Sequence, residues 1–156
     1  MNGFVLAGTN SGCGKTTITL GLMALLKRKG LKVAPFKAGP DFIDPAFHEK
    51  ATGVNSYNLD SHLLSHEVVR NLFAGKCSDA DVAVVEGVMG LFDGMGENGE
   101  GSAAELSRIL DLPVVLAVSC KGASQSVVAT VHGFATLEPA VKVGGVILNH
   151  VPNEEH

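Results

Sequence analysis

A glycine-rich segment that carries a lysine and two threonines spans residues 8–17 and reads GTNSGCGKTT. It joins an apolar run at 4–7 to a helical pattern at 18–26. Glycines let successive backbone N–H groups converge on a polyphosphate, and the following helix directs its positive end to the same point. Lys15 supplies a positive charge, and Thr16 offers a hydroxyl to Mg²⁺. The segment therefore predicts a site for a nucleoside triphosphate.

The segment departs from the usual pattern GxxxxGK[ST]. Thr9 stands where the first glycine is expected, and Gly8 lies one residue too early. The order of strand, loop and helix still favours a phosphate loop over a chance glycine-rich turn. The residues of the loop that we expect to contact the nucleotide are Asn10, Gly12, Cys13, Gly14, Lys15, Thr16 and Thr17.

A second group of charged residues follows the strand predicted at 32–36. The next segment, 37–48, reads KAGPDFIDPAFH, and its two prolines predict a shaped loop. Ligand groups gather at the carboxyl ends of strands in α/β sheets, so Lys37, Asp41 and Asp44 are expected beside the phosphate loop. The alternative is an ordinary surface turn built from Asp and Pro, which the apolar pair between the two carboxylates makes less favourable.

Glu86 ends a fully apolar strand at 82–85. A carboxylate at a strand end beside a phosphate loop commonly provides the second protein contact to Mg²⁺. For Thr16 and Glu86 to reach one ion, this strand and the strand at 4–7 must be adjacent. The alternative role for Glu86 is a helix or turn cap.

The remaining elements alternate along the chain. Because strands alternate with helices, we predict an α/β fold with a parallel sheet and helices on both faces, in three layers. Residues 55–60 are expected to form a loop. Ser102 begins a capping box, and Ser124 is expected to cap the last helix. The strands are predicted at 4–7, 32–36, 82–85, 113–119 and 143–148, and the helices at about 16–29, 61–74, 102–110 and 124–137.

Composition narrows the class of protein. The 156 residues have room for one domain, and 46% hydrophobic with 5% aromatic residues indicates an aliphatic core. A net charge of −4, with the basic cluster 27–32 at a helix end, argues against a nucleic-acid partner. Apolar runs are far shorter than the roughly 20 residues that span a bilayer. We therefore expect a soluble, cytoplasmic protein without a membrane partner.

Two further patterns carry less weight. Cys13, Cys77 and Cys120 are spaced neither as a disulfide framework nor as a zinc site, and Cys120 lacks the glycine that a nucleophile elbow places two residues earlier. His62 and His66 lie four apart on the predicted helix, but no third ligand is evident. We expect free thiols and a solvated histidine pair.

The chain resembles the cobyrinic acid a,c-diamide synthase family, in its N-terminal ATP-binding domain, a P-loop NTPase of the dethiobiotin synthetase-like type. The resemblance runs from Gly8 to about Asn149. It rests on KAGPDFIDP at 37–45 with His48 behind it, on NLD at 58–60, and on VEGVMGLFDG at 85–94.

The resemblance implies an enzyme of cobalamin biosynthesis, an ATP-dependent amidoligase with glutamine as amido donor. It would amidate the peripheral a and c carboxylates of a tetrapyrrole such as cobyrinic acid through an acyl phosphate. A C-terminal glutamine amidotransferase domain, absent from these residues, would supply the ammonia. The implied catalytic residues are Lys15, Lys37, Asp41, Asp44 and Asp93. Thr16, Asp41 and Glu86 would hold Mg²⁺, and Asn149 would meet adenine.

Alternatives stay open at this point. They are the related nickel sirohydrochlorin a,c-diamide synthase of the coenzyme F430 pathway, a dethiobiotin synthetase-like carboxylase and a non-catalytic nucleotide-sensing domain. Phe42 replaces the family's usual tyrosine, and an aromatic residue is missing after Asp60, which leaves the tetrapyrrole open. Residues 1–156 are expected to be one ATP-binding domain that is cut at its C-terminal end, because no helix follows the last strand. Both a monomer and a homodimer are open.

Overall fold

A computed structural model of the chain describes residues 2–96 and 99–152. The described residues form a six-stranded parallel sheet in the order β3-β2-β4-β1-β5-β6. The elements in chain order are β1 (Gly3–Gly8), α1 (Lys15–Arg28), β2 (Val33–Ala38), α2 (Asp44–Thr52), β3 (Tyr57–Leu59), α3 (His66–Lys76), β4 (Val82–Gly90), α4 (Ala103–Leu110), β5 (Val114–Ser119), α5 (Ser126–Thr136) and β6 (Val143–Asn149).

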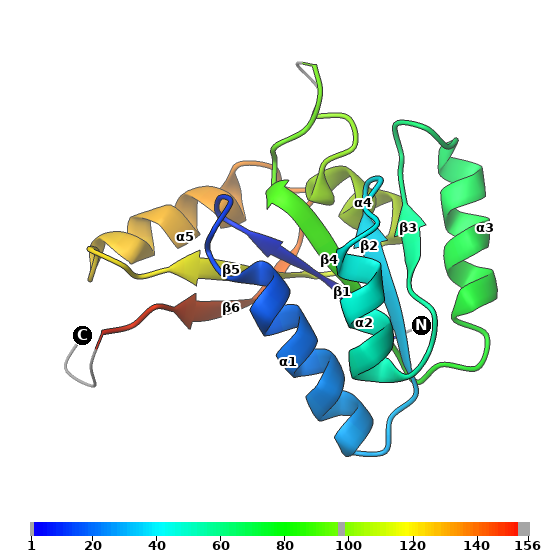
Figure 1. Cartoon of the computed structure of the whole chain (residues 1–156). Coiled ribbons are helices and arrows are strands. Elements are labelled where there is room, and N and C mark those ends of the chain that lie inside the picture. Colours follow the sequence, from blue (N-terminus) through cyan, green and yellow to red (C-terminus); the bar gives the residue numbers. More distant parts are fainter. Residues whose placement is uncertain (1, 97–98, 153–156) are drawn as a thin grey trace.

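Helices cover both faces of this sheet, so the predicted three-layer α/β fold is confirmed (Figure 1). One cluster of buried side chains, around Met23 of α1 and Val84 of β4, lies between the sheet and α1. A larger cluster lies on the other face, beneath α3, α4 and α5. The central strands are buried on both sides, which explains their unbroken apolar sequences.

The predicted contact between the first strand and the strand that carries Glu86 is confirmed, although this strand does not end at Glu86 but continues to Gly90. β1 pairs with β4 in parallel, and Leu6 lies opposite Glu86 in the register. Both of these side chains are fully buried. The pairing brings the end of β4 beside the loop that leaves β1.

Two predictions about the segment after β2 were wrong. The loop expected at 37–48 contains the start of α2 at Asp44, because Pro45 falls in the first helical turn, where a missing N–H costs nothing. The loop expected at 55–60 contains β3, which pairs with β2 over Phe36 to Ala38. Three residues are too few to show the alternation that identifies a strand.

Two helix starts also differ from prediction. α3 begins at His66 instead of residue 61, because Asp60 Oδ1 accepts the N–H groups of His62 and Leu63 and Ser65 caps the helix. His62 and His66 therefore share no helix. α5 begins after Gln125 without a side-chain cap, so the capping role expected of Ser124 was wrong. The cap by Ser102 on α4 is confirmed.

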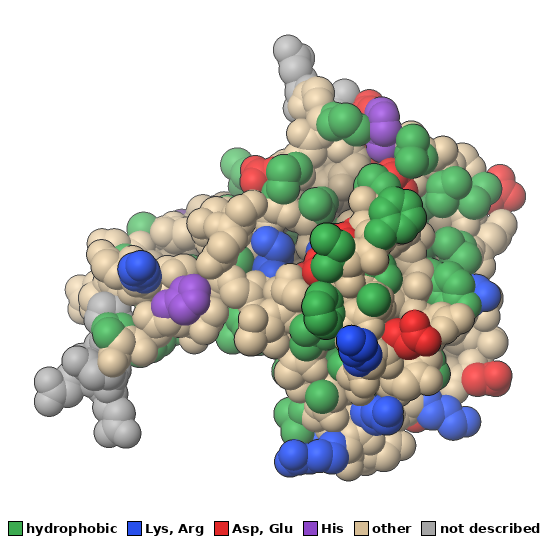
Figure 2. All heavy atoms as spheres, viewed as in Figure 1, with side chains coloured by type: hydrophobic (Ala, Val, Ile, Leu, Met, Phe, Trp, Pro, Cys, Tyr) green, Lys and Arg blue, Asp and Glu red, His purple; other side chains and the backbone are tan. Residues whose placement is uncertain are grey.

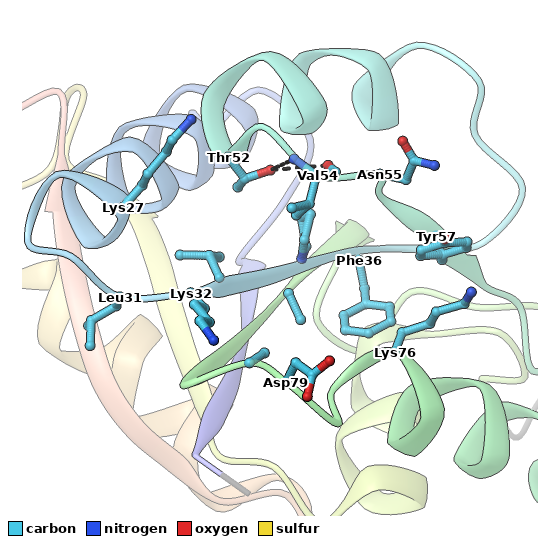
Figure 3. A pocket seen from close by; sticks show the side chains of 14 residues that line it. Lys27, Leu31, Lys32, Phe36, Thr52, Val54, Asn55, Tyr57, Lys76 and Asp79 are labelled. Carbon is cyan, nitrogen blue, oxygen red and sulfur yellow. Dashed lines mark hydrogen bonds between the residues drawn. The ribbon is translucent and has the colours of Figure 1, made fainter.

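A groove of about 640 Å³ lies along the amino-terminal half of β2 (Figure 3). β3 covers β2 only from Phe36 onward, so the edge of β2 before it is not covered by a neighbouring strand. Pro35 lies on this edge and has no backbone N–H, so it cannot donate a hydrogen bond to a strand of another molecule. Lys76 closes one side of the groove, with its Nζ 4.3 Å from the centre of the Tyr57 ring.

Among the described residues, no helix is both long and apolar enough to cross a membrane. The buried apolar side chains pack on the two faces of the sheet. Phe36 of β2 is fully buried, and its ring centroid lies 5.0 Å from that of Phe73 on α3.

We predict that Phe36→Ala lowers the free energy of unfolding by about 3–5 kcal/mol, because it removes a buried ring and leaves a cavity. Phe42→Ala is the matched control, since the Phe42 side chain is 90% exposed. Urea denaturation followed by circular dichroism gives both values. Equal losses in the two variants would contradict the assignment of Phe36 to the core.

Candidate active site

The loop between β1 and α1 has the backbone of an anion site. Gly12 and Gly14 adopt left-handed conformations, with φ of 80° and 97°. A Cβ on Gly14 would lie 2.2 Å from Asn149 Nδ2, so this position excludes any side chain. No side chain caps the start of α1, which leaves its first N–H groups free for phosphate oxygens.

Asn149 joins the far edge of the sheet to this loop. Its Nδ2 donates to the backbone oxygen of Cys13 at 2.9 Å. The structure therefore places the predicted base-contacting residue against the phosphate loop, with Cys13 itself buried. Contact between Asn149 and adenine stays a prediction.

Glu86 is the centre of a buried charge network. Its Oε1 accepts from Thr16 Oγ1 at 2.6 Å and from Lys37 Nζ at 3.2 Å, and its Oε2 accepts from His48 Nε2 at 2.7 Å. Burial raises the pKa of this carboxyl, but the hydrogen bonds from His48 and Thr16 and the charge of Lys37 outweigh burial and hold the pKa below its usual value. Glu86 is therefore an anion at neutral pH.

Lys37 is the buried cation of the same network. Its Nζ lies 2.7 Å from Asp44 Oδ2 and 3.9 Å from Asp41 Oδ2, and it donates to the backbone oxygen of Gly87 at 3.2 Å. With Glu86, these partners satisfy an ammonium that has almost no contact with water. The structure therefore brings the predicted Lys37, Asp41, Asp44 and Glu86 together.

Asp41 also shapes the loop before α2. Its Oδ1 accepts the N–H groups of Ile43 at 2.7 Å and of Asp44 at 3.1 Å. Partial burial raises the pKa of the Asp41 carboxyl. These hydrogen bonds and the charge of Lys37 outweigh burial, so that the pKa lies below its usual value. The Asn58 side chain of β3 donates to the backbone oxygen of Asp41 at 2.8 Å and holds the loop in place.

A pocket of about 320 Å³ lies between the phosphate loop and the network. Five predicted side chains, those of Lys15, Thr16, Thr17, Lys37 and Glu86, meet here from three different segments of the chain. The lining residues are Ser11, Gly12, Gly14, Lys15, Thr16, Thr17, Lys37, Glu86, Gly87, Val88 and Met89. Asp93 is not among them, because its Oδ2 accepts the N–H of Gly90 at 2.9 Å and holds the turn after β4.

The donor set fits Mg²⁺ in part. Within residues 2–96 and 99–152, no three His, Cys, Asp or Glu side chains are grouped as metal ligands. Lys37 Nζ stands between Asp41 and Glu86, so these two carboxylates do not form a shared cage. Mg²⁺ bound with a nucleotide needs only one or two protein oxygens, and the adjoining Thr16 hydroxyl and Glu86 carboxylate would be the residues to hold it.

His48 is the site residue that we did not predict from the sequence. Its side chain is fully buried, with Nδ1 2.9 Å from Ser56 Oγ and Nε2 against Glu86. His48 lies four residues after Asp44, which is one turn of α2, so both side chains face Lys37 and Glu86. The spacing indicates this only when the segment is known to be helical.

The comparisons with known proteins agree with this geometry. The family model described as CobQ/CobB/MinD/ParA nucleotide binding domain matches residues 4–156. The chain belongs to this family. The predicted recognition and P-loop fold are thereby confirmed, and the chain carries the nucleotide-binding domain that gives the family its name.

Curated relatives carry more specific names. The chain is 50% identical over 153 residues to a hydrogenobyrinate a,c-diamide synthase of Streptomyces coelicolor, covering 97% of this chain and 32% of the relative. It is 48% identical over 154 residues to a cobyrinate a,c-diamide synthase of Salmonella typhimurium, covering 98% of this chain and 34% of the relative. The chain thus spans about a third of the length of these relatives.

Solved structures support the fold alone. The BceF tyrosine kinase domain superposes with a TM-score of 0.66 at 17% identity, covering 97% of this chain and 69% of that chain. The signal recognition particle receptor FtsY from Elizabethkingia anophelis gives 0.63 at 18% identity, covering 94% and 49%. Identities this low carry no argument about the reaction.

The first prediction from the site concerns Glu86. Because its folded pKa is lowered, its stabilising contribution is complete above its ordinary value of 4.5 and is lost as the pH falls through the lower folded value. The difference in unfolding free energy between the parent and Glu86→Gln should be largest near pH 7 and shrink below pH 4.5. Glu49→Gln, on the exposed face of α2, is the control. A difference that does not change with pH would contradict the network.

The second prediction concerns His48, which we expect to position Glu86 for Mg²⁺. His48→Gln should weaken Mg²⁺-dependent nucleotide binding about 10–100-fold, the usual effect of removing a partner of a metal-bound carboxylate. Binding without Mg²⁺ should change little. Isothermal titration calorimetry with and without the metal separates the two, and His132→Gln on exposed α5 is the control. Equal losses in both titrations would show that His48 only supports the fold.

Proposed function

We propose that this chain is the ATP-binding domain of an amidoligase that converts peripheral carboxylates of a tetrapyrrole, such as cobyrinate or hydrogenobyrinate, into amides during cobalamin biosynthesis. The observation that carries the proposal is the Lys37 ammonium, which Asp44 and Glu86 hold in the wall of the phosphate pocket. The names of the relatives support the choice of substrate.

A buried lysine at this place suits phosphoryl transfer to a carboxylate. Two anions, the γ-phosphate and the incoming carboxylate, must approach each other, and a fixed cation lowers that cost more than a mobile one. Lys15 at the start of α1 and Lys37 at the end of β2 line one pocket from opposite segments. We assign both lysines to charge neutralisation.

The proposed reaction has two steps. A carboxylate oxygen of the substrate attacks the γ-phosphorus of ATP, the bond from that phosphorus to the bridging oxygen breaks, and ADP leaves. Ammonia then attacks the carbonyl carbon of the acyl phosphate, loses a proton and expels phosphate, which leaves the amide. Thr16 and Glu86 would hold Mg²⁺, which neutralises phosphate charge when bound.

The aspartates receive separate roles in this proposal. Asp44 lies 2.7 Å from Lys37 Nζ and orients the ammonium. Asp41 shapes the loop that carries Asp44 and faces the same lysine, so it is a candidate to take the proton that ammonia loses. Asp93 holds the turn after β4, and a direct part in the reaction stays a sequence-based prediction.

We propose glutamine as the source of ammonia, released by a separate amidotransferase domain of the full-length protein. Residues 1–156 would then belong to the ligase part of that protein. Cys120 follows β5 and is almost completely buried, so it is poorly placed to attack glutamine in solvent. We expect no glutaminase activity from residues 1–156.

The test of the proposed function uses the full-length protein with ATP, Mg²⁺ and ammonium chloride. Cobyrinate and hydrogenobyrinate are offered separately, and mass spectrometry follows the loss of one mass unit for each amide formed. We expect a diamide from one of the two substrates, with one ADP released for each amide formed and therefore two for each diamide. ATP hydrolysis without any amide on either substrate would overturn the proposal.

A further prediction concerns Lys15. Lys15→Ala should lower kcat/KM for ATP by an amount equivalent to about 2–4 kcal/mol, because the phosphate charge loses its nearest cation in the loop. Lys29→Ala, at the exposed end of α1, changes the same residue type away from the pocket. Initial rates at varied ATP measure both. Parent-like kinetics in Lys15→Ala would show that the phosphate loop takes no part in the reaction.

A further inference from the structure

A second pocket, of about 220 Å³, opens beside the phosphate pocket. The two pockets share Val88 and Met89, at the end of β4. Its walls come from the β2–α2 loop, the turn before α3, and the segment after β4. The lining residues are Gly39, Pro40, Asp60, His62, Leu63, Val88, Met89, Gly94, Met95, Glu100 and Gly101.

The interior of this second pocket is apolar. Leu63, Met89 and Met95 provide side chains that are 69%, 46% and 49% exposed, which is high for large apolar groups. The charged members of the lining have partners elsewhere. Asp60 accepts backbone N–H groups of its own turn, and His62 lies 3.9 Å from Glu100 at the rim. The described residues of the lining therefore offer mainly apolar contact to a ligand.

Met89, on the boundary between the two pockets, has a strained backbone. Its φ is 44°, a left-handed conformation that is unfavourable for a non-glycine residue. Strain of this kind persists where the surrounding structure needs the residue in one place. Here it places a methionine between the two pockets, where its flexible thioether can adapt to a ligand.

The walls of the pocket are fastened to each other by one carboxylate. Glu105, in the first turn of α4, accepts from Ser61 Oγ at 2.5 Å and from the N–H of Gly101 at 2.7 Å. These residues flank His62 and Glu100 of the lining. Because two separate segments depend on one side chain, the pocket is held open without a ligand.

Further apolar side chains surround the pocket. Phe42 and Ile43, two and three residues after Pro40, are 90% and 69% exposed. Figure 2 shows hydrophobic side chains gathered over the loops at this end of the sheet. Exposed apolar groups that cluster beside a phosphate pocket indicate a ligand surface.

We propose that this second pocket, with Leu63, Met89 and Met95, receives the apolar edge of the tetrapyrrole ring while one peripheral carboxylate reaches Lys37 in the phosphate pocket. The inference rests on the proposed function and adds the place where the acceptor binds. A volume of about 220 Å³ admits an edge of the ring and not the whole macrocycle. The rest of the ring lies over the exposed residues at the rim.

The proposal explains how one site reaches a carboxylate at the edge of a large substrate. The charged side chains of the ring cannot enter an apolar pocket without losing hydration, so they are directed away from it. The carboxylate next to the inserted edge is directed past Met89 toward the phosphates. The second pocket thus orients the acceptor, and the network around Lys37 activates it.

The test compares two leucines with the same exposure. Leu63 and Leu137 are each 69% exposed, but Leu137 follows α5 and lines neither pocket. In the full-length protein with Mg²⁺ and a non-hydrolysable ATP analogue, the absorbance change on titration with cobyrinate or hydrogenobyrinate gives Kd. Glutamine is neutral, so Leu63→Gln tests apolar contact without repelling carboxylates. We expect Leu63→Gln with Met95→Gln to raise Kd about tenfold, from the loss of two buried apolar contacts.

Controls separate this inference from the proposed function. Leu63→Met and Leu137→Gln should bind the tetrapyrrole as the parent does, and all variants should keep the parent's affinity for the ATP analogue. Parent-like tetrapyrrole binding in the double variant would overturn the role proposed for the second pocket and leave the proposed function unaffected. A parent that binds and amidates neither tetrapyrrole would overturn both.

Discussion

The pairing of a buried carboxylate with a buried ammonium underlies the whole site. Glu86 and Lys37 lie opposite each other on the neighbouring strands β4 and β2, and neither charge is stable away from water unless the other lies beside it. Thr16, His48 and Asp44 complete the hydrogen bonds and thereby fix the phosphate loop and α2 relative to the sheet. The fold and the chemistry therefore depend on the same few atoms.

The parts of this site that sequence reasoning predicted are those that topology dictates. Glycines before a lysine and a threonine indicate a phosphate loop, and parallel strands must end at one edge, so Lys37 and Glu86 had to lie near it. His48 and Asn58 were missed because their roles depend on α2 and β3. The prolines led us to predict a loop where α2 begins, and the three residues of β3 are too few to show the alternation of a strand.

The two neighbouring pockets are built from different kinds of structural element. The polar pocket is built from residues on strand ends and on the first turn of α1, which rigid elements hold in place. The apolar pocket is built mainly from turns, which the single carboxylate of Glu105 holds together. Residues typical of phosphate sites thus lie on the sheet, and in our proposal the features that distinguish one acceptor from another lie on the turns.

The hydrogen bond from Asn149 to Cys13 joins residues 136 positions apart. Closing so long a loop of chain costs more entropy than forming a local contact, so such a contact forms late in folding. The phosphate loop is synthesised first, but the Asn149 amide that hydrogen-bonds to it follows only with β6. A nascent chain therefore carries an incomplete nucleotide site until β6 has been synthesised and has joined the sheet.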